Sequence, residues 1–107
     1  MKTIDGKEVK RMVESGNAVL VDLDKKEKFK GTHLKGSVNM PHDEKDVVQR
    51  IQKKFHDKNE KIIICSRSPL DTSARKVCTE IEKSGYKNLY NYSAAPSEWK
   101  SVGLAIG

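Results

Sequence analysis

Cys65 is the residue whose sequence context best suits chemistry. It ends KIIIC, the most hydrophobic stretch of the chain, and the polar segment SRSPLD follows it. A cysteine between a buried strand and a helix can be surrounded by loop amides and faced by the positive end of the helix dipole. Both features lower a thiol pKa and stabilise an anion on sulfur. We therefore expect a reactive thiol at Cys65, with a small buried apolar cysteine as the other interpretation.

The second cysteine and the histidines are weaker candidates. Cys78 shares the apolar stripe of a predicted helix with Ala74, Val77 and Ile81, which favours a core thiol over a resolving cysteine. The first ten residues lack the apolar stretch of a secretory signal, so both thiols are expected to be free. The histidines show no HxxxH or HxxE spacing, and no metal site is predicted.

Length and composition predict one globular domain over residues 1–107. A chain of 107 residues can close one core but not two. Hydrophobic residues make up 36%, charged residues 34%, and no low-complexity tract interrupts the chain, so a strongly solvated surface is expected. No apolar run approaches a membrane span, which argues against a membrane protein and makes the cytoplasm the default location.

The net charge of +6 comes mainly from lysine, which is densest in KKEKFKGTHLK at residues 25–35. Nucleic-acid readers combine basic stripes with arginine forks and exposed aromatic rings, whereas this chain has only four arginines and six aromatic residues. No nucleic-acid partner is therefore predicted. A basic surface favours anionic substrates or an acidic protein partner through long-range steering.

Predicted helices and strands alternate along the chain. Asp5 and Glu8 form a capping box for a helix that stops before Gly16. The remaining predicted elements are strands over 18–23, 61–65 and 88–92, helices over 43–55 and from Asp71 or Thr72 to Gly85, and a turn over 96–99. This alternation indicates parallel strands with right-handed crossovers. Ligands bind outside the carboxyl ends of such strands, where Cys65 is expected.

Four ordered motifs resemble the rhodanese family. VDLDKKEKF is similar to the family's Asp-x-Arg-x-x-x-Glu-Phe/Tyr, THLKGSVNMP to Gly-His-Ile-Pro-Gly-Ala-x-Asn-x-Pro, and KIIIC to the strand bearing the nucleophile. GYKNLYNYSAAPSEW resembles Gly-Phe-x-Asn-Val-x-x-x-x-Gly-Gly-x-x-x-Trp. The resemblance implies an α/β fold, with a central parallel sheet of about five strands flanked by helices on both faces. It also implies that Cys65 is catalytic and that His33 is a structural hydrogen-bonder. Trp99 is expected to pack the C-terminal segment onto the sheet.

Five positions outside the loop that follows Cys65 depart from the family pattern. Asp24 and Lys28 stand where the family has arginine and glutamate, so we expect the same local ion pair with its charges reversed. Thr32 and the pair at 94–95 replace family glycines. If those glycines need positive φ, the loops must adopt other conformations here.

The loop after Cys65 is longer than the family's short Cys-x-x-Gly-x-Arg-Ser/Thr loop and resembles a less common, longer-looped group. The candidate substrate-binding loop comprises Ser66, Arg67, Ser68, Pro69, Leu70, Asp71, Thr72 and Ser73. Arg67 either binds an anionic donor or is a solvated loop residue. Pro69 lacks an amide for an anion cradle, and Asp71 opposes a dianion unless it caps the helix, so thiosulfate is expected to be a poor donor.

The resemblance implies a sulfurtransferase that carries sulfane sulfur as a persulfide on Cys65, with no cofactor. Its partners would be a small anionic sulfur donor and a thiol or cyanide acceptor, and the thiol could belong to a protein. Cysteine-dependent phosphatases of this fold need Cys-x5-Arg, and Asp71 stands at that position. A catalytically silent rhodanese-like binding module is the alternative.

Overall fold

A computed structural model describes residues 1–67 and 72–107 of the chain. The described elements are β1 (Lys2–Thr3), α1 (Gly6–Glu14), β2 (Ala18–Asp22), α2 (Lys26–Gly31), β3 (Val38–Asn39), α3 (Val47–Lys54), β4 (Lys61–Ser66), α4 (Ser73–Lys83), β5 (Leu89–Ser93) and α5 (Pro96–Ser101). The strands form one sheet of order β1-β5-β4-β2-β3, and every pair is parallel. The predicted α/β fold with a five-stranded parallel sheet is confirmed.

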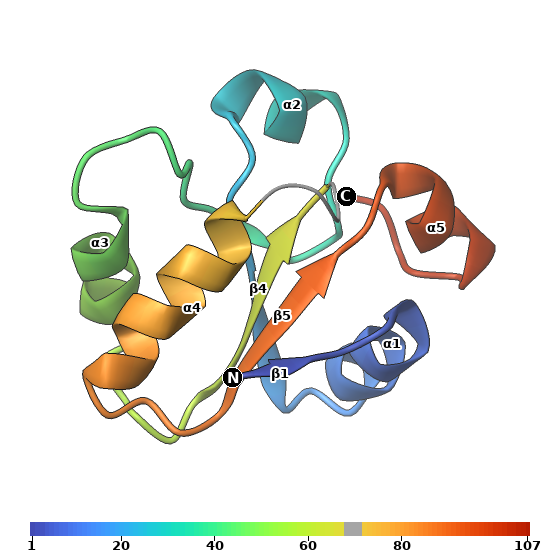
Figure 1. The fold of residues 1–107 in the computed structure, drawn as a ribbon. Coiled ribbons are helices and arrows are strands. Elements are labelled where there is room, and N and C mark those ends of the chain that lie inside the picture. The colour runs from blue at the N-terminus through green and yellow to red at the C-terminus, as the bar shows by residue number, and fades with distance from the viewer. Residues whose placement is uncertain (68–71) are drawn as a thin grey trace.

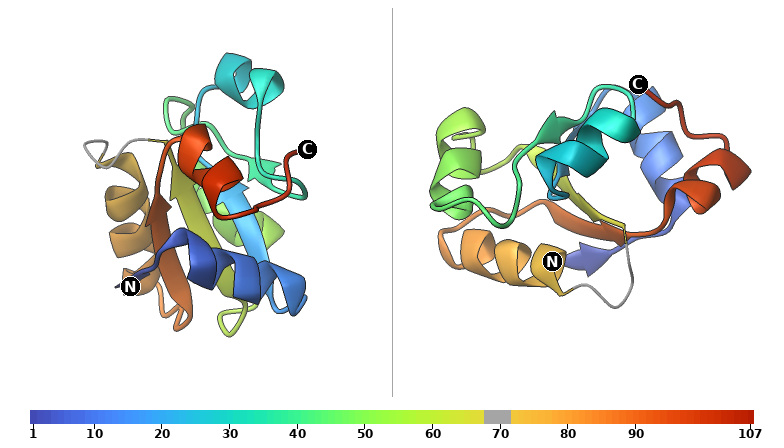
Figure 2. Two further views of the ribbon diagram at one scale, coloured as in Figure 1. Left: turned by 90° about the vertical axis from the view of Figure 1, so that its right-hand side faces the viewer. Right: turned by 90° about the horizontal axis from the view of Figure 1, so that it is seen from above.

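Helices cover both faces of the sheet, as predicted. Helices α3 and α4 lie against one face, and α1 and α5 lie against the other (Figures 1 and 2). Each face of the sheet has its own hydrophobic core. Residues of β4 contribute alternately to the two cores, because successive side chains of a strand point to opposite faces. Ile62 and Ile64 pack in the core that contains α4, whereas Ile63 and Cys65 pack with Trp99 in the other.

Local signals define several helix boundaries. Asp5 is the N-cap of α1, and its side chain accepts a hydrogen bond from the Glu8 amide at 2.9 Å. Gly16 and Gly85, which follow α1 and α4, have φ of +73° and +97°, the left-handed conformation of helix-ending glycines. Thr72 is the N-cap of α4, but its side chain makes no capping bond. Asp71, the alternative cap, lies outside the described residues.

The two short edge strands and α2 were not predicted. Strand β1 pairs with β5 and β3 pairs with β2, and each contains only two residues. Helix α2 lies beyond the carboxyl ends of the strands and contributes no buried residue (Figure 1). The segment after α2 is held by the end of the chain, because the Gly107 amide donates to the His33 carbonyl and the Lys35 amide to the Ala105 carbonyl.

Candidate functional site

Cys65 lies in β4, one residue before the strand ends at Ser66. Its neighbours across the sheet are Asp22 in β2 and Tyr92 in β5. The residue is 3% exposed, and its thiol makes a weak 3.8 Å hydrogen bond to the Ile63 carbonyl. The structure thus brings Cys65 to the carboxyl edge of the sheet, but as part of the packed core rather than as an open loop residue.

The electrostatic environment of Cys65 differs from the expectation of a depressed pKa. Burial raises the pKa of the Cys65 thiol well above its ordinary value, and the nearby carboxylates of Asp22 and Asp24 raise it further. The sequence-based expectation was wrong because the strand continues through Cys65 and turns its side chain into the core. The predicted convergence of loop amides involves Ser68, Pro69, Leu70 and Asp71, which lie outside the described residues.

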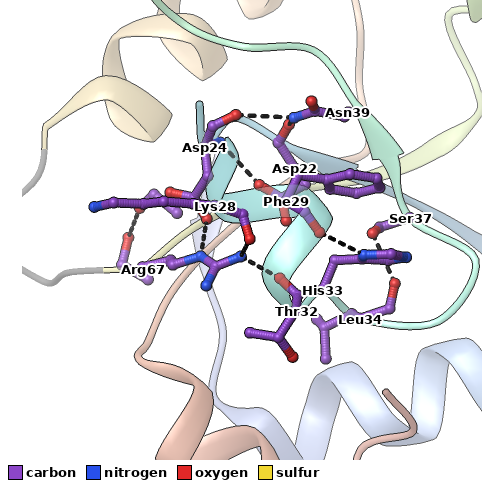
Figure 3. Close-up of polar contacts among 12 residues, drawn as sticks. Asp22, Asp24, Lys28, Phe29, Thr32, His33, Leu34, Ser37, Asn39 and Arg67 are labelled. Carbon is purple, nitrogen blue, oxygen red and sulfur yellow. Dashed lines mark hydrogen bonds and ion pairs between the residues drawn. The ribbon is translucent and has the colours of Figure 1, made fainter. Parts of the chain in front are cut away.

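Two buried aspartates adjoin the thiol at the end of β2. One carboxylate oxygen of Asp22 accepts a 2.8 Å hydrogen bond from the Asp24 amide. The Asn39 side chain donates to the backbone carbonyls of Asp22 and Asp24 at 3.0 and 2.9 Å (Figure 3). Burial is the main reason that the pKa of Asp22 rises to about 6, and the nearby Asp24 charge adds to it. This corner of the sheet therefore holds two acidic groups beside one thiol.

Arg67 pairs with Asp24, which corrects the expected pair between Asp24 and Lys28. The Arg67 Nε donates to the Asp24 carboxylate, and its Nη2 donates to the backbone carbonyls of Lys28 and Thr32 (Figure 3). The guanidinium also lies 5.2 Å from the centre of the Trp99 ring. Arg67 is thus neither a free anion clamp nor a solvated loop residue. It fastens the end of β4 to α2.

Other candidates take structural positions. The ring of His33 stacks on Phe29 with centroids 3.9 Å apart, and its Nδ1 lies 2.7 Å from the Phe29 carbonyl, as expected of a structural hydrogen-bonder. Trp99 is 1% exposed and Cys78 is fully buried, so the predicted anchor and core thiol are confirmed. Burial raises the pKa of Cys78 to about 12.

Where the family has glycines, this chain needs no positive φ. Thr32 and Ala95 have φ of −161° and −73°. The Ala94 amide donates a 3.0 Å hydrogen bond to the Ser66 carbonyl, so this loop is held against the end of β4. The side chains of Ser66 and Ser93 also lie 3.0 Å apart between Oγ atoms. The substitutions are therefore accommodated without left-handed backbone at Thr32 or Ala95.

Sequence reasoning missed Asp22, Asn39 and the true partner of Arg67. The only available signal for Asp22 was its place at the end of a predicted buried strand, since a polar residue there reaches the same sheet edge as Cys65.

Within residues 1–67 and 72–107, no three His, Cys, Asp or Glu side chains gather as a metal site. No helix in the same ranges is long and apolar enough to cross a membrane.

The chain matches one protein family in sequence and several solved structures in fold. The family model for the rhodanese-like domain matches residues 5–102. The rhodanese-like domain of an Anabaena protein superimposes with a TM-score of 0.78 at 18% identity, over 100% of this chain and 79% of that chain. A thiosulfate sulfurtransferase from Pseudomonas aeruginosa gives a TM-score of 0.81 at 14% identity, over 100% of this chain and 20% of that chain.

A rhodanese with anions from E. coli gives a TM-score of 0.60 at 22% identity, over 69% of this chain and 82% of that chain. No curated protein matches the chain significantly. These three structural likenesses, at 14–22% identity, show the fold alone. The family model, which spans most of the sequence, shows that the chain belongs to the rhodanese-like domain family.

Proposed function

We propose that this protein is a sulfurtransferase that carries sulfane sulfur on Cys65. The position of Cys65 supports this most. Cysteine is a nucleophile, and Cys65 lies near the carboxyl end of β4, the central strand of the parallel sheet. Membership of a family that includes sulfurtransferases adds to it. Cys78, the other thiol, lies on α4 in the core on the opposite face of the sheet, with its sulfur against the Tyr90 carbonyl in the middle of β5. It is therefore not at the carboxyl edge of the sheet, where a carrier would be reached.

The transfer has two balanced steps. The Cys65 thiolate attacks the outer sulfur of a donor, a sulfur–sulfur bond forms on Cys65, and the donor's own sulfur–sulfur bond breaks with its electron pair leaving on the donor. A nucleophilic thiolate or cyanide then attacks the outer sulfur of the persulfide and releases the Cys65 thiolate. No electrons are gained or lost overall, and no cofactor is required.

The surroundings of Cys65 favour donors of low charge. Asp22 and Asp24 oppose negative charge near the sulfur, and they raise the pKa of its thiol. The Arg67 guanidinium already donates hydrogen bonds to Asp24 and to two backbone carbonyls, so it does not serve as a binding group for a dianion. We therefore propose that a low-molecular-weight persulfide, which carries a single charge on its sulfane sulfur group, is a better donor than the thiosulfate dianion. The reaction should accelerate as the pH rises, because only the thiolate attacks.

A specific observation also supports a second candidate, the catalytically silent binding module. The Cys65 residue is 3% exposed and its thiol has a raised pKa, both of which disfavour nucleophilic attack. The presence of a cysteine at this edge of the sheet favours sulfur transfer over the silent module. The two functions differ in whether sulfur can be loaded onto the protein at all.

Intact-protein mass spectrometry tests the proposal. After incubation with an excess of a low-molecular-weight persulfide at about pH 8, the wild type should gain one sulfur atom, and cyanide should remove it with release of thiocyanate. Cys65→Ser should abolish the gain, whereas Cys78→Ser should retain it. Thiosulfate should load sulfur more slowly than the persulfide. If no donor loads the wild type, or if the added mass follows Cys78, the binding module becomes the better assignment.

A further inference from the structure

Lysine side chains crowd α2 and its flanks. Residues 25–35 contain five lysines and a single acidic residue, Glu27, and all six of these side chains are exposed. We call the five lysines the α2 lysine patch: Lys25, Lys26, Lys28, Lys30 and Lys35. No ion pair involves them in the part of the chain that the structure describes. Their charge is therefore available to a partner.

The patch is not explained by the needs of the fold. Helix α2 buries no residue, so its lysines do not cover core residues of their own helix. Asp24, which immediately precedes the patch, is already paired with Arg67. A run of like charges on a short exposed helix costs stability through mutual repulsion unless something compensates it.

The patch adjoins the candidate site. Arg67, two residues beyond Cys65, donates to the backbone carbonyls of Lys28 and Thr32 and thereby fixes α2 to the end of β4 (Figure 3). The Leu23 amide, just before the patch, donates a 3.0 Å hydrogen bond to the Cys65 carbonyl. A molecule held on α2 would therefore lie at the carboxyl edge of the sheet, where the sulfur is carried.

The composition and spread of the patch favour a protein partner over other anions. Lys26 and Lys30 are four residues apart and share a side of α2, whereas Lys28 faces elsewhere, so the charges do not converge on one small anion. Residues 25–35 contain no arginine, and the two aromatic rings of this segment, Phe29 and His33, stack on each other. Nucleic-acid sites use arginine forks and free aromatic faces. An extended acidic protein surface is the better match.

We propose that the α2 lysine patch docks an acidic protein whose thiol accepts sulfur from Cys65. This inference rests on the proposed sulfur transfer and adds the class of acceptor. The acceptor thiolate attacks the outer sulfur of the Cys65 persulfide, a new sulfur–sulfur bond forms on the acceptor, and the Cys65 thiolate leaves. Opposite charges would speed encounter by roughly ten-fold or more at low salt, and the gain would shrink as salt screens them.

Two synthetic thiol peptides of equal length provide the probe, one with glutamates and one with lysines around a single cysteine. Protein preloaded with sulfur is mixed with each peptide or with neutral 2-mercaptoethanol, and the second-order rate of sulfur loss is measured at 20 and 500 mM salt. The test variant is Lys26→Glu/Lys30→Glu/Lys35→Glu. Its charge-matched control, Lys58→Glu/Lys61→Glu/Lys87→Glu, reverses exposed lysines near the amino end of β4.

The acidic peptide should react about ten-fold faster than the lysine peptide with wild type and with the control variant at low salt, and the difference should collapse at high salt. The test variant should lose or invert this preference while its rate with 2-mercaptoethanol is unchanged. Equal peptide rates, with normal transfer to 2-mercaptoethanol, would overturn the docking proposal and leave sulfur transfer intact. Failure to load sulfur at all would instead remove the proposed function.

A binding measurement makes the docking claim independent of chemistry. The acidic peptide with serine in place of its cysteine should shift amide resonances of residues 25–35 in NMR spectra of wild type but not of the test variant. A single-stranded oligonucleotide should not produce these shifts at 150 mM salt. Tighter binding of the oligonucleotide than of the peptide would assign the patch to nucleic acid and overturn the proposal.

Discussion

Asp22 and Cys65 are register partners across β2 and β4, and the carboxylate of the first raises the pKa of the thiol of the second. Burial is the larger cause of the raised pKa, and Asp24 adds to it. Burial in the core and the charges of the two aspartates therefore both disfavour the thiolate of the proposed carrier. This relationship makes Asp22 a positioning residue whose charge should control the reactivity of Cys65.

Asp22→Asn should make Cys65 more reactive. The amide keeps an oxygen that can accept the Asp24 amide hydrogen bond but removes the negative charge, so the thiol pKa should fall. In a Cys78→Ser background, alkylation of Cys65 by iodoacetamide at pH 8 should accelerate several-fold, since one pKa unit is about ten-fold in thiolate. Glu44→Gln, at an exposed surface position, is the control. An unchanged rate in Asp22→Asn would show that the Asp22 charge does not govern the thiol.

Asp22 should also make stability depend on pH. Its pKa rises from 3.8 to about 6 on folding, chiefly through burial, so the folded protein binds this proton more tightly than the unfolded chain. The stabilisation is present below about pH 4 and is lost as the pH rises through about 6. Between pH 4 and 7, the free energy of unfolding should fall by about 2 kcal/mol more in wild type than in Asp22→Asn. If urea unfolding gave the same pH dependence of the free energy of unfolding for wild type and Asp22→Asn, this prediction would be contradicted.

Arg67 should matter more for stability than Lys28. The Arg67 and Asp24 side chains are 15% and 8% exposed, and removing one member of such a pair leaves the other buried without its counter-ion. Arg67→Gln should cost about 3 kcal/mol, whereas Lys28→Gln should cost under about 0.5 kcal/mol. In a double-mutant cycle with Asp24→Asn, the free energies of unfolding lost by the two single variants should sum to more than the loss in the double variant. Strict additivity in urea unfolding would indicate that the pair contributes no coupling energy.

Cys78 should be needed for packing and not for sulfur. It is fully buried on α4, with its sulfur 3.9 Å from the Tyr90 carbonyl. Cys78→Ala should lower the free energy of unfolding by about 1–2 kcal/mol through lost contacts and a small cavity. Sulfur loading of the folded variant should match wild type by mass spectrometry. Loss of loading with the fold retained would give Cys78 a part in the chemistry.

The fold was largely predictable because local signals agreed with one another. The uninterrupted apolar runs of β2 and β4 are typical of strands buried on both faces, and their predicted positions were confirmed to within a residue. The Asp5 cap and the glycines at 16 and 85 marked helix ends for reasons of backbone geometry alone. By contrast, β1 and β3 are strands only because they pair with β5 and β2. Each is two residues long, which is too short to show an alternating pattern of apolar residues in the sequence.

The sequence by itself determined which residue is the candidate, because only Cys65 follows an apolar strand and precedes a polar loop and a helix. Only the tertiary structure decided the chemical state of that residue. Local spacing suggested Lys28 as the partner of Asp24, but the pairing of β2 with β4 brings Arg67 to it instead. The same pairing sets Asp22 beside the thiol and raises its pKa. Charge interactions act through space, so register and burial, rather than spacing along the chain, determine them.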